Sequence, residues 1–157
     1  MVIGQNVKYV EMVPCQAVAS NATAQTNTVS YCDTLGYDHL AVVVALGVAA
    51  ATNHPLATLK LQQSDDTNAS NFAEATGFVN GTDFTTPTST FAAVTNITQV
   101  HAVFSIPLQG RKRYWRPVLT PNTTGSQLAH VMGILSRGEA SPTNASGVGA
   151  QVFVTPS

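Results

Sequence analysis

Charged side chains are scarce in this 157-residue chain. They make up 10% of its residues, compared with about 25% in an average globular domain. The seven Lys and Arg residues are balanced by eight Asp and Glu residues, for a formal net charge of -1. A nucleic-acid-binding protein needs a basic face whose charge is not cancelled elsewhere, so the composition argues against a nucleic-acid partner. Thr, Ser, Asn and Ala take the place of the missing charges, and such a surface suits dense assembly.

The sequence also lacks long apolar runs and a secretory leader. The longest apolar run, residues 40–51, is too short for a membrane span, which takes about 20 residues, so no membrane partner is expected. Residues 1–8 have no charged start, apolar stretch or cleavage site, so we expect synthesis in the cytoplasm. Of two cysteines in a reducing compartment, both are more often free and buried than paired. Cys15 and Cys32 would form a disulfide only if the fold brought them together.

Catalytic and metal-binding motifs are missing as well. The four histidines lack the spacing of such motifs; they are His39, His54, His101 and His130. A metal site would arise only if strands brought His101 and His130 face to face. The loop with Asp65, Asp66 and Asn68 lacks the oxygen-ligand spacing of a calcium site, so a capped turn is the simpler interpretation. We therefore expect no enzymatic activity, no cofactor and no metal.

Strand patterns, by contrast, are frequent. Residues 39–48 are apolar on both faces and β-branched, which is typical of a central strand. Residues 57–62 alternate apolar and polar side chains, which predicts a half-exposed strand. The remaining predicted strands are 7–13 (ended by Pro14), 100–108, 112–120, 127–136 and 150–155. Residues 16–30 are predicted to be an arm or long loop, and 71–90 a loop with one helical turn around 71–75.

The short connection Gln109-Gly110-Arg111 lies between two of these strands, so residues 100–108 and 112–120 are predicted to pair as a β-hairpin. Pro107 and Pro117 cannot donate a backbone hydrogen bond and belong at a sheet edge, a strand end or a bulge. The strand 112–120 is therefore expected at the periphery of its sheet.

Short strands separated by turns, without alternating helices, indicate an all-β fold. We expect an antiparallel β-sandwich, jelly-roll-like. The length predicts one domain, residues 1–157, with a single core. Within it, residues 1–30 would form an extended arm, or an edge strand plus loop, and residues 139–157 a polar C-terminal tail with a last short strand.

The segment 110–120 contains four of the seven Lys and Arg residues and the only Trp. Strand alternation sends Tyr114 and Arg116 to one face and Arg113 and Trp115 to the other. If Tyr114 faces the core, Trp115 lies outside beside Arg113 as an interface anchor; with the opposite facing, Trp115 is in the core and the cations are solvated. The sequence leaves both arrangements open. The candidate partner-contact residues are Arg111, Lys112, Arg113, Tyr114, Trp115 and Arg116.

Five short stretches, taken in order, resemble a known family. They are TVSYCDTLGY (28–37), LAVVV (40–44), LKLQQSDD (59–66), GFV (77–79) and GRKRY (110–114). An Asp-Thr-x-Gly-Tyr turn before an apolar strand, a Ser-Asp-Asp turn after a Leu-rich strand and a basic strand near the C-terminal third resemble the capsid decoration proteins of tailed bacteriophages, also called cement or head-stabilising proteins. The resemblance spans roughly residues 28–137.

The resemblance implies a structural protein of the virion, on the outer capsid surface. Its partners would be the major capsid protein, which it cross-bridges, and further copies of itself, commonly as a homotrimer. Apolar strand faces would make the subunit contacts, with Leu128, Met132 and Ile134 as candidates. The N-terminal arm and the basic segment would lie across neighbouring shell subunits.

Two other functions fit the same sequence. In a carbohydrate-binding module, Trp115 and Tyr114 would stack on sugar rings while Asp65, Asp66 and Asn68 would bind hydroxyls. A tail or fibre component of a virion would have the same composition as a decoration protein, and the sequence does not separate the two.

Overall fold

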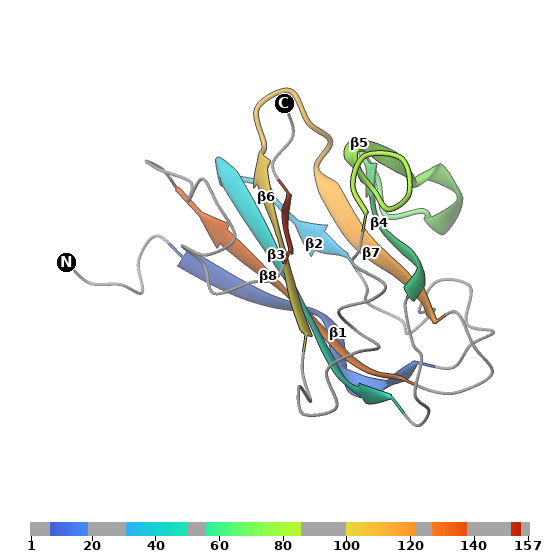
Figure 1. The fold of residues 1–157 in the computed structure, drawn as a ribbon. Helices are drawn as coiled ribbons and strands as arrows, with labels where there is room; N and C mark the ends of the chain where they lie inside the picture. Colours follow the sequence, from blue (N-terminus) through green and yellow to red (C-terminus); the bar gives the residue numbers. More distant parts are fainter. Residues whose placement is uncertain are drawn as a thin grey trace.

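The structure, a computed structural model, describes residues 7–18, 31–49, 56–85, 100–121, 127–137 and 152–154. This part of the chain is almost entirely β-strand, arranged in two sheets packed against each other (Figure 1). The all-β sandwich expected from the sequence is confirmed. The one helical element among the described residues is a single 3-10 turn, η1 (Ala69–Asn71).

One sheet has five strands and the other has four. In spatial order, the five-stranded sheet consists of β1 (Val7–Val18), β8 (Gln127–Ser136), β3 (His39–Ala49), β6 (Val100–Pro107) and β9 (Val152–Val154). The four-stranded sheet consists of β2 (Cys32–Asp33), β7 (Tyr114–Pro121), β4 (Leu56–Ser64) and β5 (Ala73–Val79). All neighbours are antiparallel except β9, which runs parallel to β6.

The first eight strands pair in a nested pattern. β1 pairs with β8, β2 with β7, β3 with β6 and β4 with β5. This is the pairing of one long hairpin that is rolled over onto itself. The successive strand pairs along this hairpin therefore alternate between the two sheets. The resulting strand orders, β1-β8-β3-β6 and β2-β7-β4-β5, are those of an eight-stranded jelly roll, to which β9 is added.

The predicted hairpin of residues 100–108 and 112–120 is wrong. β6 belongs to the five-stranded sheet and β7 to the four-stranded sheet, so the connection between them passes from one layer to the other (Figure 1). Alternation correctly identifies the inward side chains, such as Phe104 on β6 and Leu119 on β7, which are both fully buried. It does not tell whether two such strands lie side by side or face each other across the core.

The position of the basic strand also differs from the prediction. β7 lies between β2 and β4 rather than at the periphery, although β2 pairs only with its first two residues, Tyr114 and Trp115. Beyond Trp115 no described strand pairs with β7 on that side, so Pro117 lies at a local edge, where its missing N–H is tolerated. Pro107 is the last residue of β6, a strand end as expected.

Three local predictions need correction. Pro14 does not end the first strand, because β1 continues to Val18 at the sheet edge, with irregular register on both sides of Val13. The predicted loop 71–90 contains β5, and the helical turn lies at Ala69–Asn71 instead of 71–75, because Asn68 caps it there. Residues 19–30 and 138–151 lie outside the described residues, as do 1–6 and 155–157, so most of the predicted arm and tail stays a prediction.

The core lies between the two sheets, and β3 is the central strand of its sheet, as predicted. Fully buried side chains from both layers fill it, among them Leu40, Val42, Leu61, Phe78 and Trp115. Both cysteines are free, but only Cys32 is buried, so the expectation of burial is wrong for Cys15. Burial in the core raises the pKa of the Cys32 thiol to about 12, which keeps it protonated.

Candidate functional site

The segment that connects the two sheets is the first candidate surface. After β6, the turn is closed by a hydrogen bond from Arg111 N to Leu108 O, at 3.0 Å. Gly110 has a φ of 72°, in the left-handed region that side chains with a Cβ rarely adopt. This turn leads into β7 and thereby places Arg111, Lys112 and Arg113 at one end of the sandwich.

Trp115 points into the core. Its side chain is fully buried, and its ring meets that of Phe78 edge to face, with centroids 6.0 Å apart. The indole Nε1–H donates to the carbonyl of Lys112 at 2.9 Å, so the one polar atom of the ring is satisfied. Of the two facings that the sequence left open, the structure has the one with Trp115 inside. The prediction that Trp115 contacts a partner is therefore wrong.

With Trp115 inside, Tyr114 and Arg116 lie on the outer face of the four-stranded sheet. Tyr114 meets Tyr31 edge to face, with ring centroids 5.4 Å apart, and Tyr31 in turn lies 6.5 Å from Phe72. The guanidinium of Arg116 stacks over Phe72 at 4.3 Å, and that of Arg113 over Tyr114 at 4.8 Å. These five residues, here termed the aromatic–arginine cluster, are Tyr31, Phe72, Arg113, Tyr114 and Arg116.

Both arginines of the cluster are held by further contacts within the chain. Arg113 binds Asp33 through two hydrogen bonds, Nε to Oδ1 at 2.8 Å and Nη2 to Oδ2 at 2.7 Å. These bonds lower the pKa of the Asp33 carboxyl. Arg116 donates from Nε to Gln62 Oε1 at 2.8 Å and from Nη2 to Ala69 O at 3.2 Å. The cluster is thus fixed in place before any partner arrives, which lowers the entropic cost of binding.

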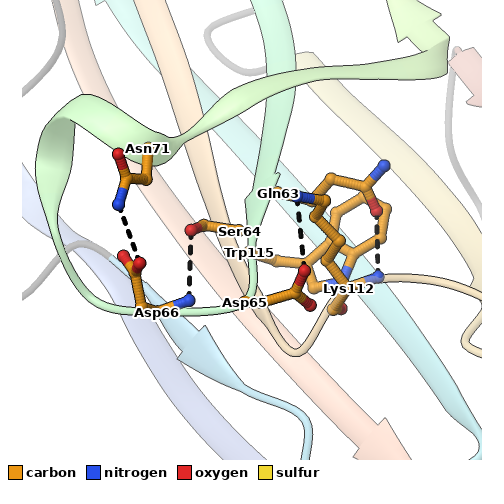
Figure 2. Close-up of polar contacts among 7 residues, drawn as sticks. All are labelled: Gln63, Ser64, Asp65, Asp66, Asn71, Lys112 and Trp115. Carbon is orange, nitrogen blue, oxygen red and sulfur yellow. Dashed lines mark hydrogen bonds and ion pairs between the residues drawn. The ribbon is translucent and has the colours of Figure 1, made fainter.

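Lys112 and Arg111 also have partners on neighbouring elements. Lys112 Nζ lies 3.3 Å from Asp65 Oδ2, and its backbone N–H donates to Gln63 Oε1 at 3.3 Å (Figure 2). Arg111 Nη1 donates to Thr76 O at 3.3 Å. Two of the four cations in this segment therefore face carboxylates, Asp65 and Asp33. The segment offers a shaped polar surface rather than a strong positive potential.

The Ser64–Asn71 loop beside Lys112 is a capped turn, as predicted. Asp66 accepts from Asn71 Nδ2 at 2.7 Å, and Ser64 Oγ accepts from Asp66 N at 3.2 Å (Figure 2). Asp66 also accepts from Asn68 N at 2.8 Å. The bond from Asn71 is the main reason that the pKa of Asp66 is lowered. Asn68 caps η1 by accepting from Ser70 N at 3.2 Å. Within the described residues, no three His, Cys, Asp or Glu side chains are grouped so as to hold a metal ion.

The second candidate surface is the outer face of the five-stranded sheet. The outward side chains on β8 include the three predicted subunit-contact residues Leu128, Met132 and Ile134; Leu128 is 47% exposed and the other two are partly exposed. Register places Ile134 between Tyr9 and Ala41, and Met132 between Glu11 and Val43. We term this surface the apolar face; its outward residues are Val7, Tyr9 and Glu11 on β1, Leu128, His130, Met132, Ile134 and Ser136 on β8, His39, Ala41, Val43, Ala45 and Gly47 on β3, and His101, Val103, Ser105 and Pro107 on β6.

Three histidines lie on the apolar face. His101 and His130 both pair in register with Ala45, one on each side of β3. His130 Nε2 is 3.7 Å from Glu11 Oε1. His39 shares a hydrogen bond of 2.8 Å with Ser105 Oγ, and burial lowers its pKa. His101 and His130 are therefore separated by a strand, and Glu11 lies beside His130 on the β1 side.

Sequence reasoning located part of these surfaces. It identified Tyr114, Arg113 and Arg116, and it placed the subunit-contact candidates on one strand. It missed Tyr31 and Phe72, which come from the ends of β2 and β5 and meet Tyr114 only through the fold. The one available signal was the run of aromatic and turn residues around Tyr31, Gly36 and Tyr37.

The comparisons with known proteins add no family: no family model and no curated protein matches the chain. In the part of the chain that the structure describes, no helix has the length and apolarity of a membrane span.

Proposed function

We propose that this chain is a structural protein of a tailed-bacteriophage virion, which decorates the outside of the capsid and stabilises it by cross-bridging major capsid proteins. It would act as an oligomer of identical subunits. The observation that carries the proposal is that the sandwich has two unlike outer faces. One sheet presents the aromatic–arginine cluster and the other presents the apolar face, so that a subunit can hold two kinds of neighbour.

The aromatic–arginine cluster is the proposed contact with the shell. Tyr and Arg are enriched among the residues that dominate protein interfaces, and here two tyrosines and two arginines are prearranged by stacking and hydrogen bonds. One of the two positive charges is compensated, because Asp33 pairs with Arg113. Such a surface favours a protein partner over a polyanion. The weak contacts of several subunits of one oligomer would add up to firm attachment.

The apolar face is the proposed contact between subunits, with Leu128, Met132 and Ile134 at its centre. The fold is compatible with this assignment, since jelly rolls are common in viral capsid proteins, but a fold alone does not set a function. The carbohydrate-binding alternative loses its main residue, because the buried Trp115 cannot stack on a sugar. A tail or fibre position would use the same two surfaces.

The test is to add purified protein to capsids of the encoding virus that lack it, and to measure co-sedimentation and the temperature of shell rupture. We expect saturable attachment and a higher rupture temperature. Tyr114→Ala should weaken attachment by about 30-fold or more if Tyr114 is an interface anchor. Thr82→Ala, an exposed change in the loop after β5, is the control. Absence of attachment by the unaltered chain would contradict the proposal.

A further inference from the structure

The apolar face differs from the outer face of the other sheet in its chemistry. Among its described residues it has no Lys, Arg or Asp, and Glu11 is its one carboxylate. The outer face of the four-stranded sheet, by contrast, has the Lys60–Glu74 ion pair and the polar side chains of Gln62, Arg116 and Thr58. An antiparallel sheet that faces water normally presents polar side chains there. The apolar face therefore has the composition of a surface that another protein layer covers.

Among the described residues, three large hydrophobic side chains are exposed, and two of them lie on this face. Tyr9 is 64% exposed and Leu128 is 47% exposed. They stand near opposite ends of the face, with the partly exposed Met132, Ile134 and Val43 between them. Exposed apolar groups that form one continuous surface mark interaction sites, whereas singly scattered ones do not.

The size of the face fits an interface between two proteins of this kind. Three of its strands, β1, β8 and β3, are spaced about 4.8 Å apart, and at nine residues of about 3.4 Å each they outline roughly 450 Å². β6 adds little, because its outward Val103 and Ser105 are buried. Two such faces in contact would bury about 900 Å², which is near the lower limit for a specific interface. A small ligand would leave most of this surface exposed.

From these observations we propose that the apolar face is covered by the apolar face of a second copy of this chain, related by a two-fold axis. A head-to-tail contact would need a second, complementary surface on the same molecule, and the outer face of the other sheet carries the aromatic–arginine cluster, which is assigned to the shell. The apolar face of one copy would then contact the same face of the other copy, as in an isologous dimer. The inference rests on the self-association proposed above, and it names the surface and the symmetry.

Charge selects one of the two ways in which the faces can stack. If the two-fold axis runs parallel to the strands, β1 of one copy lies over β6 of the other, so Glu11 approaches the edge that holds His101. If the axis runs across the strands, β1 lies over β1 and the two Glu11 carboxylates approach each other. The first arrangement avoids this repulsion. Both arrangements keep the strands of the two faces aligned, as in β-sandwiches, where they cross at about 30°.

The experiment measures the mass of the full chain in solution by sedimentation equilibrium at micromolar concentration. We expect twice the 16.4 kDa mass of one chain. Met132→Asp and Tyr9→Asp should each raise the dimer dissociation constant by about 30-fold or more, because a carboxylate would be buried in an apolar contact. Thr58→Asp, on the outer face of the other sheet, should leave it unchanged.

Tyr9→Asp keeps the test decisive if Met132→Asp fails to fold, because Tyr9 is mostly exposed in the single chain. A monomeric or trimeric unaltered chain would overturn the two-fold contact, as would a dimer that survives both face variants. Shell attachment is measured separately. A dimer without attachment would contradict the capsid role alone, and attachment by a monomer would contradict the dimer alone.

Discussion

At the scale of single residues, the side chains that suggested a charged contact surface are held mainly by the chain itself. Arg113 binds Asp33 and stacks on Tyr114, Arg116 binds Gln62 and stacks on Phe72, and Lys112 faces Asp65. The sequence showed the concentration of cations, but not these partners, which lie far away along the chain. Nor could it decide the facing of Trp115, because that depends on contacts such as the one with Phe78 of β5, a distant strand in the sequence.

The buried indole predicts a large effect on stability. Trp115→Ala removes the largest fully buried side chain and leaves a cavity beside Phe78, so the free energy of unfolding should fall by about 3–5 kcal/mol. Urea denaturation measures this change. Leu35→Ala, at a residue that is 68% exposed, is the control and should change stability by less than about 1 kcal/mol. A similarly small loss for Trp115→Ala would mean that Trp115 is not a core residue.

The Asp33–Arg113 pair predicts a specific pH dependence. Hydrogen bonds from Arg113 lower the pKa of Asp33 below its ordinary value of 3.8. The stabilising contribution of the pair is therefore complete above the unfolded-state pKa and is lost as the pH falls through the lower folded-state pKa. It is small, because both side chains are partly exposed.

An NMR titration of the Asp33 carboxyl checks this directly. The midpoint should lie below pH 3.8 in the unaltered chain and should rise toward 3.8 in Arg113→Gln. Identical midpoints in the two proteins would show that the guanidinium does not hold this carboxylate in solution.

At the scale of elements, strands with strong patterns were predictable and their neighbours were not. The two-sided apolar run 39–48 is β3 and the alternating run 57–62 is part of β4, as predicted. β5 was missed because its buried residues Ala75 and Phe78 are three positions apart, with Gly77 at a φ of 91° between them, so that the alternation is interrupted. The predicted hairpin failed because a jelly roll pairs β1 with β8 and β3 with β6, and such distant pairings leave no local signal.

The turn between β4 and β5 provides a test at this scale. Asn68→Ala removes the side-chain acceptor for Ser70 N at the start of η1, so the free energy of unfolding should fall by about 1 kcal/mol. Thr67→Ala, at the exposed neighbouring residue, is the matched control. Equal urea midpoints for Asn68→Ala and the control would show that the cap does not stabilise the turn.

At the scale of the whole molecule, a jelly roll with two unlike outer faces suits the proposed role of bridging two kinds of neighbour. Composition indicated a surface that is poor in charge and suited to assembly, and the subunit-contact candidates on β8 do lie outward on the apolar face. The sequence could not show that β1, β3 and β6 complete this face, because the four strands come together only through the nested pairing.

The central proposal is that the chain sits on the outside of a capsid. Electron cryomicroscopy of capsids with and without the added protein tests it most directly. We expect extra density of a two-layer β-sandwich at regular positions on the outer shell, with the aromatic–arginine cluster toward the major capsid protein. Density confined to the tail or its fibres, or no added density at saturating protein, would contradict it.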